Sequence, residues 1–160
     1  MDPMRELYED MILDHNRNPR NFEHRPAGAN RHAHGFNPIC NDEFRLHLRV
    51  DNGVIVDIGF EGAGCAISTA STSLLTEAVK GKTEAQARAL FRSMHDLLTD
   101  AAPAADVGKL AVLGGVHEYP MRIKCATLPW HTLRAALDGN RDTVCTEPAD
   151  TEVCRTPDAG

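Results

Sequence analysis

The sequence has no long apolar run and few aromatic residues. Aromatic side chains make up 5% of its 160 residues, and no stretch approaches the roughly 20 apolar residues that cross a bilayer. We therefore expect no membrane-spanning segment. The N-terminus also lacks the apolar stretch of a signal peptide, because charged residues crowd it: Asp2, Arg5, Glu6, Glu9 and Asp10. The expected location is the cytoplasm, where cysteines stay reduced and more often act as ligands or nucleophiles than as disulfides.

An excess of positive charge is also missing. The chain has 17 Lys and Arg residues against 23 Asp and Glu residues, a formal net charge of −6. Nucleic acid and anionic membrane surfaces are therefore not expected as main partners, since phosphate binding needs a basic surface. No internal repeat or low-complexity tract is present. A hydrophobic content of 42% and a charged content of 25% are ordinary for one soluble domain of this length.

Periodicity predicts four helices and one hairpin. The hairpin comes from the alternation between Phe44 and Val50, a turn at residues 51–53, and a return strand over residues 54–60. His47 lies on the polar side of this alternation, so it is predicted to be a surface residue and not a metal ligand. The helices are predicted at residues 2–15, at residues 66–80, behind a capping box of Thr83 with Gln86, and in a last helix that carries Pro129 in its first turn and ends at Gly139.

The remaining segments show little periodicity. Residues 22–36 read as a long loop, residues 101–106 as a linker, and residues 107–119 are ambiguous. The loop carries His24, His32 and His34, which we interpret as solvated and not as a metal-binding cluster, because no thiolate or carboxylate is spaced with them. Residues 141–160 are polar, acidic and contain proline, so we expect a domain at residues 1–140 and a mobile C-terminal tail. Cys145 and Cys154 lie in that tail. We interpret them as incidental exposed cysteines, with auxiliary thiols for sulfur relay or an additional metal pair as the alternative.

Three cysteines and one aspartate form the candidate metal site. They are Cys40, Asp42, Cys65 and Cys125, each beside a turn or a helix start. Three thiolates and a carboxylate suit a borderline-soft divalent ion such as zinc in a tetrahedral site. Cys65 follows Gly62-x-Gly64 and opens a helix, where free backbone amides favour a thiolate.

Two cations flank the last of these cysteines. Arg122 and Lys124 precede Cys125, which is expected just ahead of the last helix. A cation near a thiol lowers its pKa and offsets the charge of the ligands. Taken alone, each feature has an ordinary explanation: a buried cysteine is usually inert, and Arg122 and Lys124 would be solvated surface charges. The conjunction of the local sequences favours a site.

The local sequences resemble a known family. Asn37-Pro38-x-Cys40-x-Asp42, Gly62-x-Gly64-Cys65-x-Ile67-Ser68 and Lys124-Cys125-Ala126-x-Leu128-x-Trp130 are similar to the three blocks of the IscU/SufU family of iron–sulfur cluster biogenesis proteins. The first helix and its exit at Asn18-Pro19-Arg20 also resemble this family, so the similarity runs from about residue 4 to about residue 138. The resemblance implies an α+β fold: a small antiparallel three-stranded sheet with helices packed on one face.

The SufU branch is favoured by two departures from IscU-type scaffolds. Those scaffolds usually carry His before the third cysteine, where this chain has Lys124, and residues 82–105 resemble the insertion typical of SufU. The resemblance implies a zinc-dependent sulfur acceptor. Its metal ligands would be Cys40, Asp42, Cys65 and Cys125, with Arg122 and Lys124 beside them or against the partner. Cys40 would take persulfide sulfur from a SufS-type cysteine desulfurase and pass it to a SufBCD-type cluster-assembly complex; Cys125, beside two cations, is the alternative acceptor.

Other functions stay open from the sequence. A scaffold would hold a [2Fe–2S] cluster on the same four residues. A purely structural zinc site fits less well, because such sites usually use closely spaced pairs of sulfur or nitrogen ligands. A cysteine hydrolase has no local signature here. One position also departs from the family: Asn41 stands where Gly is usual, and we expect the turn to survive only if Asn41 takes a left-handed backbone conformation.

Overall fold

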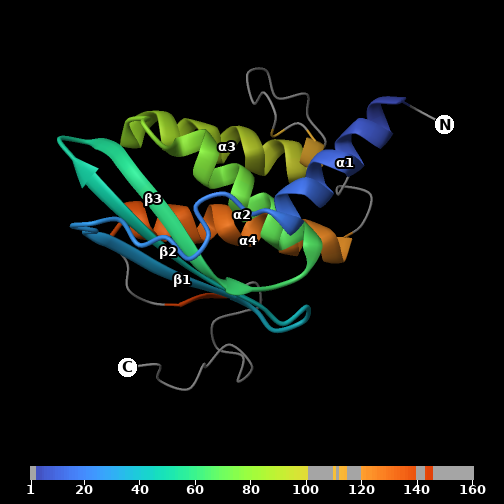
Figure 1. The fold of residues 1–160 in the computed structure, drawn as a ribbon, viewed down its shortest axis with the longest axis horizontal. Helices are drawn as coiled ribbons and strands as arrows, with labels where there is room; N and C mark the ends of the chain where they lie inside the picture. Colours follow the sequence, from blue (N-terminus) through green and yellow to red (C-terminus); the bar gives the residue numbers. More distant parts are fainter. Residues whose placement is uncertain (1–2, 101–109, 111, 115–119, 140–142, 146–160) are drawn as a thin grey trace.

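The computed structural model describes residues 3–100, 110, 112–114, 120–139 and 143–145. Figure 1 shows a sheet with helices packed on one of its faces. In chain order, the elements are α1 (Pro3–Arg17), β1 (Arg31–Asn37), β2 (Asp42–Asp51), β3 (Val54–Ala63), α2 (Ala66–Val79), α3 (Glu84–Asp100), α4 (Pro120–Leu137) and β4 (Val144–Cys145). None of the described helices is long and apolar enough to cross a membrane.

The predicted α+β fold is confirmed, with one more strand than expected. The sheet order is β3-β2-β1-β4, in which β1, β2 and β3 pair antiparallel. The two-residue β4 pairs parallel with β1 through Gly35 and Val144. The sequence did not predict β4, which lies in the segment expected to be a mobile tail; residues 141, 142 and 146–160 of that segment are outside the described residues. Cys145 in β4 is half-buried and disulfide-bonded, not an exposed free thiol.

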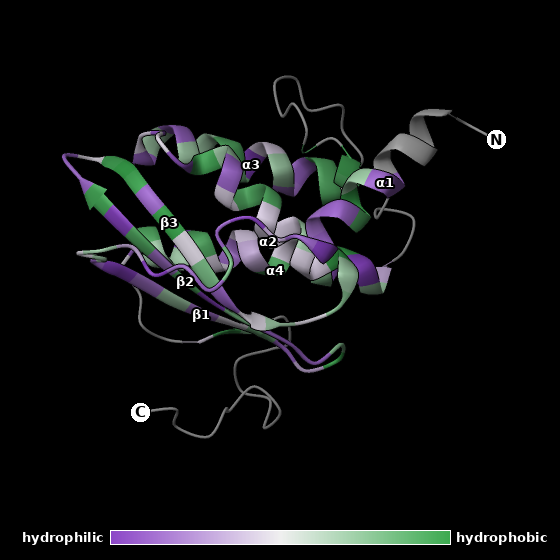
Figure 2. Ribbon diagram, in the orientation of Figure 1, coloured by the Kyte–Doolittle hydropathy of each residue, from purple (hydrophilic) through white to green (hydrophobic). Residues whose placement is uncertain are grey.

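The predicted hairpin is confirmed. Asn52 and Gly53 have φ values of 52° and 77°, the left-handed pair that a tight two-residue hairpin turn requires. Figure 2 shows hydrophobic and hydrophilic residues alternating along β2 and β3. The hydrophobic members face the helices and form the core, and they include Phe44, Leu46, Leu48, Ile58 and Phe60.

The long loop predicted at residues 22–36 is only partly correct. Its second half is β1, which pairs with β2 in the register Gly35↔Phe44. β1 has the sequence RHAHGFN, with little of the β-branched content typical of strands, so its pattern was weak. Its alternate residues Ala33, Gly35 and Asn37 are buried.

Gly35 lets α4 lie directly against β1. A Cβ atom at this position would sit 2.1 Å from Thr132 Oγ1 and 3.1 Å from Leu128 Cδ1. We expect Gly35→Ala to lower the free energy of unfolding by about 1–3 kcal/mol, the usual cost of overpacking a core. Urea unfolding measures the loss. Adding Thr132→Ala removes the clashing hydroxyl and should restore part of the stability; an unchanged double variant would refute the steric explanation.

α2 is built largely from small buried polar residues. Ser68, Ser71, Thr72, Ser73 and Thr76 are all fully buried. Their hydroxyls are hydrogen-bonded: Ser71 Oγ donates to the Ala126 carbonyl at 2.7 Å and accepts from Trp130 Nε1 at 3.2 Å. Hydroxyls that bond across the interface let α2 pack closely against α4 without leaving polar atoms unsatisfied.

α3 begins at the predicted capping box. The Thr83 N–H donates to Gln86 Oε1 at 3.0 Å, and the Gln86 N–H donates to Thr83 Oγ1 at 3.1 Å. Of the predicted linker and the ambiguous stretch that follow, most residues lie outside the described part. Leu110, Val112 and Leu113 are described and belong to the core.

The predicted start of the last helix is wrong. α4 begins at Pro120, nine residues before Pro129 (129 − 120), so Cys125 lies inside the helix and not ahead of it. Proline is well suited to a first helical position, and Pro120 fits that rule. Pro129 removes the amide that would bond the Cys125 carbonyl four residues earlier, at a cost of about 3 kcal/mol. Burial of the helix against β1, α2 and α3 offsets this cost.

The prediction that His47 is a surface residue is also wrong. Its side chain faces away from the helices, but the residue is only 6% exposed. The imidazole is covered by Glu61, Arg25 and His32, whose polar atoms lie within hydrogen-bond distance of its nitrogens. The sequence pattern identified the face correctly but gave no sign that other polar side chains cover it.

Candidate metal centre

The predicted site residues meet at one end of the sheet. In Figure 1, the turn between β1 and β2, the connection from β3 to α2, and the first half of α4 come together there. The turn carries Cys40 and Asp42, the connection carries Cys65, and α4 carries Cys125. The fold thus brings together three parts of the chain that are far apart in sequence.

The turn between β1 and β2 adopts the conformation that Asn41 permits. Asn41 has a φ of 57°, the left-handed region that Asn tolerates better than most residues. The preceding Asn37 is fully buried, and its Oδ1 accepts from the N–H groups of Ile39 at 3.1 Å and Cys40 at 3.4 Å. These contacts fix the turn, and the fully buried Asp42 follows it at the start of β2.

Cys65 is the N-cap of α2. Its sulfur accepts from the Ser68 N–H at 3.4 Å, one of the backbone amides that a helix start leaves unpaired. The Cys65 N–H in turn donates to Asp42 Oδ1 at 2.8 Å. Gly64 leaves space for this contact, because a Cβ there would lie 2.6 Å from the same carboxylate oxygen. The aspartate and the helix start therefore position each other.

Cys125 is the innermost of the three thiols. It is fully buried, and its sulfur lies 3.2 Å from the sulfur of Cys40. Asn37 Nδ2 points towards both Cys125 Sγ, at 3.6 Å, and Asp42 Oδ2, at 3.4 Å. Asn37 thus touches the two buried members of the site and holds the turn that carries Cys40.

Three of the four side chains form one compact group of donor atoms, and Cys65 lies beside it against Asp42. Atoms of Cys40, Asp42 and Cys125 lie within 4.8 Å of one another, and Cys65 Sγ lies 4.0 Å from Asp42 Oδ2. Three sulfurs and one carboxylate oxygen at such separations have the chemistry of a tetrahedral zinc site. They also have the chemistry of an iron–sulfur ligand set. The residues present fit either group.

The thiols share protons unequally. A hydrogen bond from Cys125, together with the Ser68 contacts, lowers the pKa of Cys65 to about 5. The same Cys65 contact, and then burial, raise the pKa of the Cys125 thiol. The negative charge of Cys65, and then that of Cys125, raise the pKa of the Arg122 guanidinium. In the metal-free protein these contacts favour the thiolate form of Cys65, and the Arg122 guanidinium interacts with its charge.

The low pKa of Cys65 predicts a pH profile for the metal-free protein. An ordinary thiol has a pKa of about 8.5, so alkylation of Cys65 should persist well below pH 7 and fall off as the pH drops towards about 5. Mass spectrometry of the alkylated peptides after iodoacetamide pulses at several pH values measures this profile. In Cys125→Ala, which lacks the thiol donor, the midpoint should rise; an ordinary midpoint in the unsubstituted protein would contradict the assignment.

The similarity to known proteins follows the same residues. A family model described as the NifU-like N-terminal domain matches residues 7–126, a span that includes all four candidate ligands. The chain belongs to this family.

Relatives in the NifU-like family are involved in iron–sulfur cluster assembly. The chain is 38% identical over 133 residues to the zinc-dependent sulfurtransferase SufU of Bacillus subtilis, covering 79% of this chain and 86% of the relative. It is 36% identical over 133 residues to the cluster assembly scaffold protein IscU of Streptococcus pyogenes, covering 82% of each. The predicted resemblance to the IscU/SufU family is confirmed.

Solved structures agree with this assignment. A crystal structure from Fervidobacterium islandicum, described as a candidate cluster assembly scaffold for the SUF system, superposes with a TM-score of 0.76 at 33% identity. The alignment covers 83% of this chain and 98% of that one. The crystal structure of a nitrogen-fixing NifU-like N-terminal domain from Brucella abortus has the same fold, with a TM-score of 0.75 at 23% identity.

The sequence did not reveal the parts played by Asn37 and Ser68. Asn37 was noted only as part of a local sequence that resembles the family, although its side chain contacts two candidate ligands. Ser68 was likewise noted only as part of such a local sequence, although its N–H and hydroxyl both contact the Cys65 sulfur. The signal for Ser68 was its place three residues after Cys65, the spacing of a helix cap.

Proposed function

We propose that this NifU-like protein is a zinc-dependent sulfur acceptor. In this proposal it acts in the cytoplasm with a SufS-type cysteine desulfurase and delivers sulfur to a SufBCD-type assembly complex. The observation that supports it most is the convergence of three free thiols and a buried carboxylate beside an exposed turn. The 38% identity to the zinc-dependent sulfurtransferase SufU supports the choice of activity.

The proposed zinc ligands are Cys40, Asp42, Cys65 and Cys125. A bound zinc would keep these thiols deprotonated at neutral pH and hold the three converging segments together. The carboxylate is a harder ligand than a thiolate and would make the site less tightly closed than one with four sulfur ligands. Its contact with the Cys65 N–H, at 2.8 Å, orients it for this role.

Cys40 is the proposed acceptor. Cys125, the alternative from the sequence, is fully buried, and Cys65 is fixed as a helix cap by Ser68. Cys40 is partly exposed and follows Ile39, a large apolar residue that is 56% exposed. A partner's persulfide can reach a sulfur on such a turn more easily than one inside α4.

The proposed step is a thiol–persulfide exchange. The Cys40 thiolate attacks the terminal sulfur of the desulfurase persulfide, a new sulfur–sulfur bond forms on Cys40, and the desulfurase cysteine leaves as a thiolate. No external oxidant or reductant is needed, because the transferred sulfur keeps its oxidation state. Arg122, whose charge interacts with all three thiols, offsets their negative charge. We expect the exposed Lys124 to contact the partner.

Persulfide mapping tests the proposed acceptor. The zinc-loaded protein is incubated with a SufS-type desulfurase and cysteine, its persulfides are alkylated, and its peptides are analysed by mass spectrometry. We expect an added sulfur on the Cys40 peptide, and none in Cys40→Ser. Sulfur found instead on Cys65 or Cys125 would reject Cys40 as the acceptor, and no sulfur on any peptide would reject the sulfur-acceptor function.

A cluster scaffold is the second candidate, favoured by the 36% identity to the IscU scaffold of Streptococcus pyogenes. The same four residues would then hold a [2Fe–2S] cluster as cargo. Anaerobic incubation with iron, desulfurase and cysteine separates the two functions. The proposed sulfur acceptor should not accumulate the visible absorption of a protein-bound cluster, and transfer of such a cluster to an apo-ferredoxin would establish the scaffold instead.

A further inference from the structure

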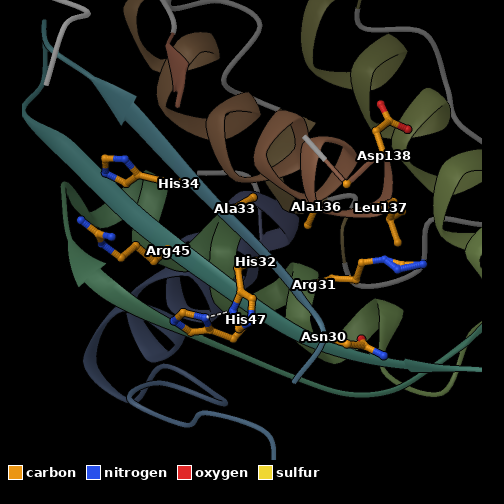
Figure 3. Close-up of a pocket in the computed structure, with 11 residues that line it drawn as sticks. Asn30, Arg31, His32, Ala33, His34, Arg45, His47, Ala136, Leu137 and Asp138 are labelled. Carbon is orange, nitrogen blue, oxygen red and sulfur yellow. Dashed lines mark hydrogen bonds between the residues drawn. The ribbon is translucent and has the colours of Figure 1, made fainter. Parts of the chain in front are cut away.

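The sheet face away from the helices carries a group of histidines that the proposed sulfur transfer does not use. An open pocket of about 840 Å³ is lined by His32, His34, Arg45 and His47 from β1 and β2, and it reaches past this face to the end of α4 on the helix side of the sheet. Figure 3 shows His32 and His47 side by side, joined by a dashed line. The two residues are direct partners across the β1–β2 ladder.

His47 is held by a carboxylate. Its Nε2 lies 2.9 Å from Glu61 Oε1 on the neighbouring strand β3. A neutral imidazole carries a proton on one nitrogen and a lone pair on the other. Since an ionised carboxylate only accepts, the proton of neutral His47 lies on Nε2, and its lone pair lies on Nδ1.

The lone pair of His47 points at the second histidine. His47 Nδ1 lies 2.7 Å from Nδ1 of His32. Two imidazole nitrogens that face each other this closely share a proton, and a metal ion can bind both only if the two rings move apart. In a tetrahedral zinc site with bonds of about 2.0–2.1 Å, neighbouring ligand nitrogens are about 3.3 Å apart. A rotation of the exposed His32 ring would open the contact by the required distance of about 0.6 Å.

From this arrangement we infer a second transition-metal site, in which His32 and His47 bind one ion such as Zn²⁺ or Ni²⁺ through their Nδ1 atoms. The Glu61–His47 contact matches the carboxylate–histidine–metal arrangement that orients imidazole ligands in metalloproteins. Water fills the other coordination positions, since a set of three candidate ligands occurs among the described residues only at Cys40, Asp42 and Cys125. The site is therefore weaker than the cysteine-containing one.

Binding needs no net loss of a proton. Without metal, His32 donates its Nδ1 proton to His47; with metal, the proton of neutral His32 moves to Nε2 through solvent, and both Nδ1 lone pairs face the ion. Arg25 is a nearby cation, with a terminal nitrogen 3.4 Å from His47 Nε2. It also pairs with Glu61 at 3.6 Å, so these two charges compensate each other. Arg45 across the pocket further limits the affinity.

The site is separate from the cysteine cluster. His47 is five residues from Asp42 along β2 (47 − 42), about 16 Å at the usual rise of a strand. The two side chains lie on opposite faces of the sheet, because Asp42 shares the parity of the core residues Phe44 and Leu46 and His47 does not. Metal binding at the His32–His47 site can therefore be tested independently of the function proposed for the cysteine-containing site.

Zinc titration of the zinc-loaded protein tests the inference. With one equivalent already bound, further Zn²⁺ is added in competition with a chromophoric chelator. We expect a second, weaker equivalent whose affinity falls at least tenfold in His32→Gln and in His47→Gln. Glu61→Ala should weaken it about 10–100-fold, as removal of a carboxylate behind a ligating histidine usually does. His24→Gln is the matched control, since His24 contacts Asp57 on the same strand as Glu61 and should leave the second equivalent unchanged.

NMR of the histidine ring nitrogens tests the site in the unsubstituted protein, so the result does not depend on the stability or activity of any variant. Zinc should shift the Nδ1 resonances of His32 and His47, and not those of His24. The exposed His32 is the safer variant if His47→Gln unfolds the protein. The absence of a second equivalent, or a second equivalent that His32→Gln leaves unchanged, would overturn the inference.

Discussion

Asp42→Ala should lower zinc affinity by about 100-fold or more. Loss of a residue behind a ligand typically costs 10–100-fold in affinity, and Asp42 is itself a proposed ligand. Asp42 Oδ1 also accepts a hydrogen bond from the Cys65 N–H at 2.8 Å. The substitution therefore also removes a contact that holds the start of α2 in place. Competition with a zinc chelator measures the affinity.

Asp42→Asn separates the two effects. The amide oxygen of Asn can still accept from the Cys65 N–H, but the side chain carries no negative charge for the metal. We expect Asp42→Asn to keep the thermal stability of the metal-free protein while losing most of the zinc affinity. Zinc affinity and sulfur-transfer activity that stay unchanged in Asp42→Ala would remove Asp42 from the ligand set.

Gly64→Ala should disturb the same site by adding an atom next to the Asp42 carboxylate, whereas Asp42→Ala removes the carboxylate. The added Cβ would lie 2.5 Å from Ser68 Oγ, 2.6 Å from Asp42 Oδ1 and 3.0 Å from the Phe44 ring. Because no contact this close is tolerated, the carboxylate or the start of α2 must move. We expect zinc affinity to fall at least about tenfold, as for other changes that misorient a metal ligand.

The exposed neighbour Ala63 supplies the matched control. Ala63→Ser changes the same connection without adding an atom next to Asp42, so it should bind zinc as the unsubstituted protein does. Thermal unfolding of both metal-free variants shows whether Gly64→Ala acts on the site or on the whole fold. Normal zinc binding by Gly64→Ala would mean that the carboxylate is not held where the structure places it.

The parts of the fold with strong local signals could be predicted from sequence. The hairpin has a regular alternation and an Asn-Gly turn, and α3 has a capping box, so both were located correctly. β1 was missed because its buried face is made of Ala33, Gly35 and Asn37, which carry little hydrophobic signal. The start of α4 was misplaced because Pro129 imitates a first helical turn, although it lies in the buried interior of the helix.

The residues of the candidate site could be predicted from sequence, but the contacts between them could not. The four residues could be selected from their chemistry and local sequence, and the left-handed conformation expected of Asn41 is confirmed by its φ of 57°. The contacts of Asn37 with Asp42 and Cys125 could not be predicted, since they depend on the placement of α4 against β1. The His32–His47 contact likewise depends on the register of β1 with β2, a strand that the sequence did not reveal.

Alanine production by a SufS-type desulfurase tests the central claim most directly. The rate is measured with cysteine as substrate, with and without the zinc-loaded protein, and with zinc-loaded Cys40→Ser. We expect a large activation by the unsubstituted protein, and we expect Cys40→Ser to abolish it. No activation by a protein shown to hold zinc would contradict the sulfur-acceptor function and leave the cluster scaffold as the better explanation of the site.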